Sequence, residues 1–445
     1  MKGKTMMLSK RVLSVLVAGA TAALLLTGCS SSSSPNNGST PGAKAKVAGE
    51  IQLTYWGSST RVAKYDQITK LFEQKYPKVK VQSAAGDFTT YFDKLNVQAA
   101  SKTIPCITTM QTRQLNDYTT NGVMMSLDSL VKSGEIDVSQ IPKSVLDTGR
   151  GPDGKLYMIP FGVAWNAITV NTAMAKEHGV ELLKPGYTWD EYGAWLKDAA
   201  AKLPAGVAAT DDQGLDEPTF SAYVISNGDK MFNSKGKIGF SKSALEDYWN
   251  MWQKYSKAGY TSTPQQDADE PTQLEQANVT LGKTLSEQTA GNALPGIQAA
   301  NPSANMGTML FATGKAGLGN MFFVSGYSIP ASCDNVAAAA AYINFWTNDD
   351  AAAEVFASDN GAVANAKQLK QQIADPPSAG VKTVLQQYES IIKAKVPAQT
   401  IPSGYNAVFE QAFKRDYQDV QFGRKTVSQA VDAFFSEANA SLGTK

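Results

Sequence analysis

Apolar and polar positions alternate along residues 51–56, which is the pattern of a strand, and the small residues 57–59 end it. From Arg61 to Tyr76 the apolar residues recur every three or four positions, which predicts a helix that the following proline terminates. Residues 79–81 alternate again. A strand, a loop, a helix and a second strand in this order predict a parallel sheet with crossover helices.

The rest of the chain continues this succession of strands and helices. Thr188 and Glu191 have the spacing of a capping box, which marks the start of a helix. Further predicted elements are strands near 156–160, 165–170 and 326–330, and helices over 243–258, 336–348 and most of 381–442. We therefore predict an α/β fold. An open α/β sheet binds its ligand beyond the carboxyl ends of its strands, because the loops converge there.

The amino-terminal segment has the order of a secretory signal peptide, because basic residues lead into the apolar run 12–26. This run of 15 residues is shorter than the ~20 that a membrane-spanning helix needs. The sequence LTGC that ends at Cys29 resembles the bacterial lipobox, whose cysteine thiol receives a diacylglycerol. We expect a lipoprotein signal peptide at 1–28 and a flexible, lipid-anchored tether at 29–47. An ordinary signal peptide that happens to contain a cysteine is the alternative.

Length, charge and cysteine usage narrow the class of protein. About 400 residues follow the tether, more than a single core of roughly 250–300 residues serves, so we expect two lobes. The net charge of +1, without long charged runs, argues against nucleic-acid binding. A single histidine, His178, and two further cysteines, Cys106 and Cys333, argue against a His/Cys metal site. Those two cysteines can pair outside the cell, but the sequence leaves this open.

Motifs for catalysis are weak. A serine or cysteine triad needs a histidine base, and His178 lies next to a predicted helix end, just before Gly179. Residues 282–284 resemble part of a phosphate-binding loop, but Ala277 stands where that motif requires a glycine. A glycoside hydrolase needs only two carboxylates, and no motif selects such a pair. We expect neither an enzyme nor a cofactor.

Seven segments together resemble a known family: LTYWG (53–57), LFEQKYPKVKV (71–81), YFDKL (91–95), DGKLYMIPFG (153–162), TWDEY (188–192), GYSIPAS (326–332) and GAVANAKQL (361–369). With the lipobox and the tether, they occur in the order seen in extracellular solute-binding proteins of sugar-importing ABC transporters, of the maltodextrin-binding type. The similarity covers the chain after Gly49, and DGKLYMIP is the most specific segment. One departure is Pro105-Cys106, where the family often has Pro-Asp, so a carboxylate is missing.

The resemblance implies a two-lobed fold, in which each lobe holds a mostly parallel sheet with flanking helices. It places three crossovers near 162–166, 323–327 and 365–373, and assigns 48–163 with 327–368 to lobe 1 and 164–326 with 369–445 to lobe 2. It also implies a monomer, anchored by lipid to the outer face of the cell membrane, that binds a carbohydrate and delivers it to an ABC permease.

A sugar presents apolar C–H faces and a rim of hydroxyls, so its site needs aromatic rings and planar polar groups on loops. Residues of these types that follow the first three strands are Trp56, Ser58, Arg61, Asp87, Phe88, Tyr91, Gln111 and Arg113. The resemblance adds Trp165, Glu217, Phe220, Gln288, Phe322 and Tyr405. Structural roles stay open for several of them: Trp56 can cap the sheet, Arg61 can form a salt bridge, and Tyr405 can pack between helices.

Trp249 and Trp252 have helical spacing with Leu245, which predicts a core-facing stripe and not a sugar platform. Our leading hypothesis is thus a lipid-anchored receptor that captures an oligosaccharide between its lobes. Two alternatives remain: a binding protein of the same fold for a non-sugar solute, and a surface glycoside hydrolase.

Overall fold

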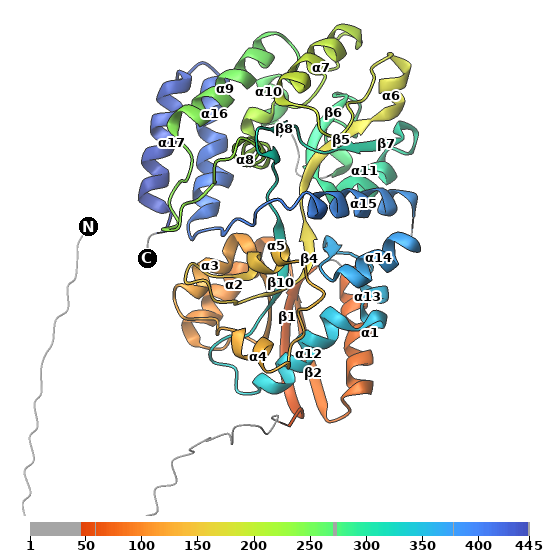
Figure 1. Ribbon diagram of the computed structural model, residues 1–445, viewed down its shortest axis with the longest axis vertical. Helices are drawn as coiled ribbons and strands as arrows, with labels where there is room; N and C mark the ends of the chain where they lie inside the picture. Colours follow the sequence, from red (N-terminus) through yellow and green to blue (C-terminus); the bar gives the residue numbers. More distant parts are fainter. Residues whose placement is uncertain (1–45, 58, 270–273, 377, 444–445) are drawn as a thin grey trace, which may run out of the picture. The chain divides into compact units, whose positions relative to one another are not determined.

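A computed structural model describes residues 46–57, 59–269, 274–376 and 378–443. The expected signal peptide, Cys29, the tether up to residue 45 and Ser58 lie outside these residues. Figure 1 shows two lobes, each built around its own sheet. None of the helices in the described part of the chain combines the length and the apolar character that crossing a bilayer requires.

Lobe 1 is built on a six-stranded sheet in the order β11-β4-β10-β3-β1-β2. Its strands are β1 (Gly49–Trp56), β2 (Val79–Gly86), β3 (Ile107–Gln111), β4 (Ile159–Ala164), β10 (Phe323–Ser328) and β11 (Ala362–Val363). β1 pairs in parallel with β2 and β3, as the first strand, helix and strand predict. β10 runs antiparallel to both β3 and β4, and β11 runs antiparallel to β4.

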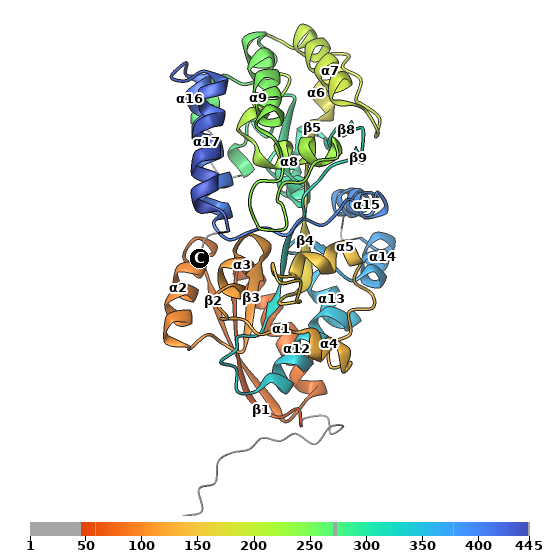
Figure 2. The ribbon, with the colours of Figure 1, turned by 60° about the vertical axis from the view of Figure 1, so that its left-hand side comes forward.

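Helices cover both faces of this sheet, as the views in Figures 1 and 2 show together. They are α1 (Ser59–Lys75), α2 (Phe88–Ser101), α3 (Thr112–Thr119), α4 (Asp128–Lys132), α5 (Lys143–Leu146), α12 (Val336–Asn348), α13 (Asp350–Phe356) and α14 (Ala366–Ala374), with the 3-10 turn η1 (Asp147–Gly149) after α5. α1 packs against α12 and α13, whereas α3 packs against β3 and β10.

Lobe 2 holds a three-stranded sheet in the order β6-β5-β7, in which both pairs are antiparallel. Its strands are β5 (Asn166–Asn171), β6 (Ser286–Ala290) and β7 (Met306–Met309), and β8 (Thr313–Gly314) and β9 (Gly317–Leu318) form a separate hairpin. Isolated parallel bridges join Ala208 to Thr284 and Thr210 to Thr261. The expectation of a mostly parallel sheet in each lobe therefore needs correction. The sheet of lobe 1 is mixed, because β10 returns from lobe 2 and runs against β3 and β4, and the three-stranded sheet of lobe 2 is antiparallel.

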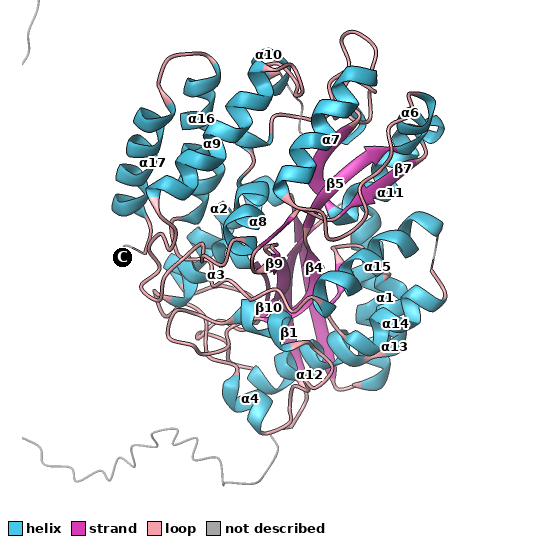
Figure 3. Cartoon of the chain, turned by 45° about the horizontal axis from the view of Figure 1, so that its top comes forward, coloured by secondary structure: helices cyan, strands magenta, loops and turns pink. Residues whose placement is uncertain are grey.

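Lobe 2 is rich in helices, which surround its sheet in Figure 3. The α-helices are α6 (Thr172–Glu177), α7 (Trp189–Lys202), α8 (Glu217–Ser226), α9 (Lys242–Lys257), α10 (Pro264–Ala268), α11 (Leu294–Ala300), α15 (Ala379–Lys393), α16 (Phe413–Gln421) and α17 (Val427–Ser441). Shorter turns are η2 (Gln213–Leu215), η3 (Leu274–Gln276), η4 (Gly291–Ala293) and η5 (Pro302–Ala304), and η6 (Asn406–Ala412) is a π-helix.

Local sequence signals explain several of these helices. α7 begins at the predicted capping box, in which the Thr188 side chain and the Glu191 side chain each bind the other's backbone N–H. In α9, Trp249 and Trp252 are fully buried, which confirms their predicted place in the core. The carboxyl-terminal third is less helical than predicted, because an extended connector, residues 394–404, separates α15 from the π-helix.

The chain passes between the two sheets at three places. β4 ends at Ala164 and β5 begins at Asn166, so Trp165 is the link between them. The second passage comes before Phe323, because all of β10 is in the six-stranded sheet. The third lies between α14, which contacts β11, and α15, which contacts α11. The second and third passages are thus a few residues away from the expected ranges, and residues 323–326 lie in the sheet of lobe 1.

A disulfide joins Cys106 to Cys333, with 4.9 Å between their Cα atoms. Cys106 immediately precedes β3, and Cys333 follows β10 after a short turn. Since β3 and β10 are antiparallel neighbours, the start of one strand lies beside the end of the other, and the two thiols meet. The question that the sequence left open is thereby answered.

We expect the double variant Cys106→Ser/Cys333→Ser to unfold more easily, because the disulfide restricts the unfolded chain over 227 residues. Removing a native disulfide costs about 2–5 kcal/mol in small domains, and we expect a loss within that range. Urea unfolding of the variant beside the unmodified protein measures it. Superimposable unfolding curves would contradict the expectation.

Lobe 2 buries two carboxyl groups side by side. The Gln421 side-chain amide donates hydrogen bonds to Oδ2 of Asp212, at 2.9 Å, and to Oδ2 of Asp267, at 3.0 Å. Burial and, less strongly, the nearby Asp267 raise the pKa of Asp212 to about 7, against hydrogen bonds from Gln421, Gly214 and Tyr417 that lower it. The folded protein therefore holds a proton at Asp212 that the unfolded chain releases at a lower pH.

A raised pKa in the folded state means that the stability from this proton is complete below the ordinary pKa near 3.8 and is lost as pH rises to about 7. We expect Asp212→Asn to lack this loss, so that its stability relative to the parent increases from acid pH to about pH 8. Denaturant unfolding at several pH values measures the difference. A constant difference between the two proteins from acid to neutral pH would rule the expectation out.

Candidate functional site

The edge of the six-stranded sheet that faces lobe 2 collects the ends of five strands. Trp56 lies beside Gly86, Gln111 beside Ser325, and Ala164 beside Phe323 in the register of the sheet. The loops after β1, β2 and β3 therefore meet the chain where it passes to and from lobe 2. Most predicted site residues of lobe 1 lie along this edge, as expected for the carboxyl ends of strands.

An aromatic group stands at the β1 end of this edge. Trp56 is buried and contacts the rings of Phe88, Tyr91 and Phe92 edge-on or tilted. The Tyr91 hydroxyl donates to backbone carbonyls of β1 and β3, which fixes α2 over the sheet. Phe88 is 42% exposed. Of this group, Phe88 thus presents a ring to solvent at the start of α2, beside the exposed Asp87.

Arg61 is committed to a partner in its own lobe. Its Nε donates to Oδ2 of Asp359 at 2.7 Å, and a second nitrogen donates to the Asp359 carbonyl at 3.0 Å. Asp359 precedes β11, so this ion pair joins the start of α1 to the sheet edge on the far side of β4. The geometry therefore gives Arg61 the salt-bridge role that the sequence left open.

Several predicted residues from distant parts of the chain converge between the lobes. Arg113, in the first turn of α3, points its guanidinium over the ring of Phe323, with 3.9 Å between Cζ and the ring centroid. Arg113 Nε lies 3.0 Å from a carboxylate oxygen of Glu410 in the π-helix. Glu217, the first residue of α8, and Tyr405 lie in the same group. In this interlobe group, lobe 1 thus supplies a cation (Arg113) and a ring (Phe323), and lobe 2 supplies two carboxyl groups (Glu217 and Glu410) and a phenol (Tyr405).

Glu217 has an unusual electrostatic environment. It is only 5% exposed, and this burial raises its pKa to about 7. The Tyr405 hydroxyl and the Arg113 cation lower the pKa, and the Glu410 carboxylate raises it. Burial is the largest of these effects, so Glu217 is a group that gains or loses a proton near neutral pH.

Around this group, buried polar oxygens lack partners at hydrogen-bond distance and angle. They are the side-chain oxygens of Gln111, Gln114, Glu217 (Oε1), Asn320, Tyr405 and Asn406. Tyr405 lies close enough to Glu217 to influence its pKa, but the geometry falls outside a hydrogen bond. Buried oxygens without partners also occur elsewhere in both lobes, for example in Gln213 and Ser328. An unpaired buried oxygen costs roughly 1–3 kcal/mol, so the six oxygens beside Arg113, Glu217 and Tyr405 are acceptors that an external hydrogen-bonding group can satisfy.

The π-helix explains how lobe 2 positions its part of the group. Residues 406–412 wind more widely than an α-helix, and such segments are frequent at functional sites. α3 holds the connector before this helix: the Asn116 amide donates to the Ile401 carbonyl, and Asp117 accepts from the Gly404 N–H. Glu410 was not predicted from the sequence, because an acidic residue in an amphipathic stretch looks like any solvated one.

Other predicted residues form the link between the lobes. Trp165 is fully buried, stacks on Tyr388 of α15, and donates from its indole nitrogen to Gln387 at 2.8 Å. Phe322 also contacts Tyr388. In this structure, therefore, Trp165 and Phe322 have no open ring face and fasten α15 to the crossing strands. Gln387 and Tyr388 were missed because a helical stripe does not show which element it packs against.

Gln288 and Phe220 have partners within lobe 2. Gln288, in β6, donates to the Asn166 side chain at 2.8 Å, and Asn320 donates to the Asn166 carbonyl. These amides surround the start of β5. Phe220 is fully buried among Phe240, Tyr248 and Phe413, so it supports α8 from within lobe 2.

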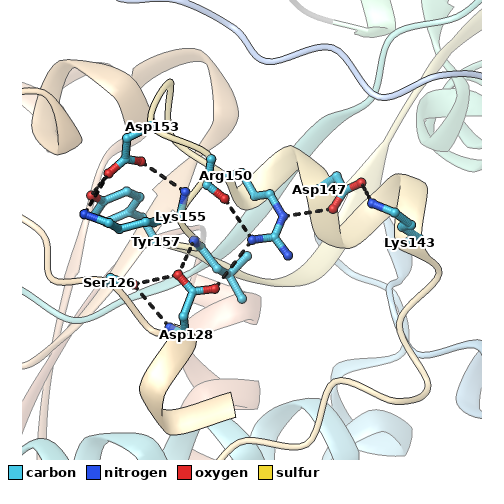
Figure 4. A network of polar contacts seen from close by, with 10 residues as sticks. Ser126, Asp128, Lys143, Asp147, Arg150, Asp153, Lys155 and Tyr157 are labelled. Atoms are coloured by element: carbon cyan, nitrogen blue, oxygen red, sulfur yellow. Dashed lines mark hydrogen bonds and ion pairs between the residues drawn. The ribbon is translucent and has the colours of Figure 1, made fainter. Parts of the chain in front are cut away.

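A separate cavity of about 810 Å³ also lies between the lobes. The turn 150–154 lines it from lobe 1, residues 228–236 line it from lobe 2, and the connector lines it at 397–402. Figure 4 shows how the turn is held: Arg150 bonds Asp147 at 3.0 Å and the Gly154 carbonyl, and the Tyr157 hydroxyl donates to Asp153 at 2.8 Å. None of the predicted site residues lines this cavity.

Metal binding finds little support in the described residues. Their one cluster with suitable spacing is Cys106, Cys333 and Asp334, and its two cysteines form the disulfide. The interlobe group offers hydrogen-bond acceptors, a cation that is already paired, and aromatic rings. This set suits a neutral, hydroxyl-bearing ligand better than an anion, which would need unpaired cations.

Comparisons with known proteins agree with this geometry. Residues 67–383 match a family model described as bacterial extracellular solute-binding protein. A Brucella abortus relative, named only as a binding protein, is 26% identical over 215 residues, which are 46% of this chain and 49% of the relative. This chain thus spans about half the length of the curated relatives it matches.

Solved structures match over a larger share of the chain. A family 1 extracellular solute-binding protein from Alicyclobacillus acidocaldarius is 25% identical, with a TM-score of 0.72, over 89% of this chain and 99% of that one. A substrate-binding protein from Listeria monocytogenes, solved in complex with cycloalternan, is 21% identical, with a TM-score of 0.71, over 89% and 100%. The two-lobed α/β fold is thereby confirmed.

Proposed function

Because this chain belongs to the bacterial extracellular solute-binding proteins, we propose that it captures an oligosaccharide between its lobes and delivers it to an ABC permease. The observation that carries this proposal is the meeting of Arg113 and Phe323 of lobe 1 with Glu410 and Tyr405 of lobe 2, beside buried oxygens without partners that a hydroxyl-rich ligand would satisfy. The cycloalternan bound to the Listeria protein of the same fold supports a saccharide as the ligand class.

Capture would proceed by closure of the lobes. With the lobes apart, solvent separates the two halves of the site. Lobe 1 carries Gln111, Arg113 and Phe88, and lobe 2 carries Glu217 and Tyr405. A ligand that touches both sets makes the closed form favourable, because only that form realises both sets of contacts. The permease would then recognise the closed form. A Kd in the micromolar range, about −8 kcal/mol, is sufficient for such a role.

Binding without catalysis fits the site best. Its polar groups come from both lobes and would contact a ligand from two sides, and Arg113 is already paired with Glu410. We therefore propose that the protein is a monomeric receptor with no enzymatic activity, and that Cys29 carries the lipid that holds it at the outer face of the membrane.

A panel of neutral oligosaccharides, uronate-containing oligosaccharides and amino acids tests the ligand class. We expect a stoichiometric thermal shift with one or more neutral oligosaccharides, since a ligand that binds only the folded state stabilises it. A shift with amino acids alone would instead indicate a non-sugar solute. Release of shorter sugars during incubation would indicate a glycoside hydrolase and end the proposal.

Phe88→Ala tests the exposed ring at the rim of the site. We expect the Kd for the sugar found by the panel to rise roughly fivefold or more, because a lost stacking contact is worth about 1 kcal/mol or more. Phe422→Ala is the matched control, since Phe422 is 41% exposed and lies at the end of α16, away from the sheet edge. Calorimetry that gives equal affinities for both variants would remove Phe88 from the site.

Cys29→Ala tests the anchor. We expect the variant to leave the membrane fraction of the producing cells, because no thiol remains to carry the acyl chains. Mass spectrometry of the amino-terminal peptide of the parent should show a diacylglyceryl cysteine. Equal membrane retention of the two proteins would contradict lipidation at this position.

A further inference from the structure

Two carboxyl groups of lobe 2 share a single cation of lobe 1. Glu217 begins α8, Glu410 lies in the π-helix, and Arg113 lies in the first turn of α3. The guanidinium is in ion-pair distance of Glu410, at 3.0 Å, and its flat face rests on Phe323. The Glu410 carboxylate therefore largely compensates the charge of the Arg113 guanidinium, and Glu217 is a second carboxyl group beside the same cation.

The surroundings of Glu217 disfavour a negative charge. Its Oε1 is buried without a hydrogen-bond partner. The charged or titratable groups that act on it are Arg113 from α3, and Tyr405 and Glu410 from the segment of the π-helix. Phe220, one turn along the same helix, faces other aromatic rings and supplies no compensation. A proton on Glu217 removes both the buried charge and the repulsion from Glu410.

These surroundings depend on the lobes being together. Arg113 and Phe323 belong to lobe 1, and the Phe323 ring lies 6.4 Å from the Tyr405 ring that adjoins Glu217. When the lobes part, these residues withdraw and water reaches the carboxyl group. Relief of burial, the largest cause of the raised pKa, lowers the pKa of Glu217 more than loss of the Arg113 cation raises it, although Glu410 stays in the same lobe. We propose that closure of the two lobes takes up one proton, which Glu217 binds. This inference rests on the proposed function, because ligand capture is the event that closes the lobes.

The sign of the effect follows from linkage. The closed form binds more protons than the open form, so a fall in pH favours closure and ligand capture. Between the ordinary pKa of glutamic acid and the value of about 7 in the closed form, affinity should weaken as pH rises. We expect the Kd to be roughly tenfold or more higher at about pH 8 than at about pH 5.5, and uptake of about one proton per ligand at about pH 6.

Titration calorimetry in two buffers of different ionisation enthalpy counts these protons directly. The probe is the panel sugar that gives the largest thermal shift. We expect proton uptake by the parent protein and none by Glu217→Gln, whose Kd should not change with pH. Glu410→Gln frees Arg113 to compensate Glu217 and should reduce the uptake. No proton uptake by the parent would overturn the proposal.

Asp212→Asn is the matched control. Asp212 also has a pKa near 7, but its neighbours all belong to lobe 2, so its proton stays in both the open and the closed form. This variant should take up the same number of protons on binding as the parent. Proton uptake that disappears in Asp212→Asn but persists in Glu217→Gln would show that Asp212 binds the proton, and would refute the proposal.

A measurement without ligand separates this inference from the proposed function. Small-angle scattering of the ligand-free protein should give a smaller radius of gyration at about pH 5.5 than at about pH 8, and no such change in Glu217→Gln. Equal radii in the parent would count against proton uptake, even if sugars bind. Failure of every panel sugar to bind would reject the proposed function and leave the scattering result to decide on the proton.

Discussion

The position of β10 between β3 and β4 is the constraint on which the rest of the structure depends. This strand returns from lobe 2 and forms antiparallel pairs on both sides, so it joins β3 to β4 within the sheet of lobe 1. A Cβ at Gly326 would lie 2.5 Å from the Ile159 carbonyl, so glycine is needed for the close approach of β4. The same strand sets Phe323 beneath Arg113 at one end and leads to Cys333 at the other. The interlobe group therefore lies at one end of β10, and the disulfide lies just beyond its other end.

The sequence predicted those parts of the fold that depend on local pattern. The first strand and the helix over Arg61 to Tyr76 lie where alternation and helical spacing indicated, within two residues, and the second strand begins at the predicted Val79 but continues to Gly86. The capping box at Thr188 and the helix end at His178, followed by Gly179 with a positive φ of 65°, are likewise set by neighbours in the chain. The resemblance to solute-binding proteins is confirmed at the level of the family.

The parts that escaped prediction depend on contacts between distant segments. Strand direction in lobe 2 is one, because a periodic strand reads the same in a parallel and an antiparallel pair. The partner of Arg61 is another, since Asp359 is 298 positions away. The ends of the crossovers and the role of Glu410 also follow from which element packs on which. A pattern within one segment cannot contain that information.

The closed covalent ring between Cys106 and Cys333 has a consequence for the integrity of the molecule. The first part of lobe 2, from β5 to β9, is inserted between these two cysteines. A protease that cuts one exposed loop there would leave both pieces bonded through lobe 1. The two pieces of such a nicked chain stay covalently joined. A cut in the connector or beyond α14 instead leaves a carboxyl-terminal fragment that only packing contacts hold in place.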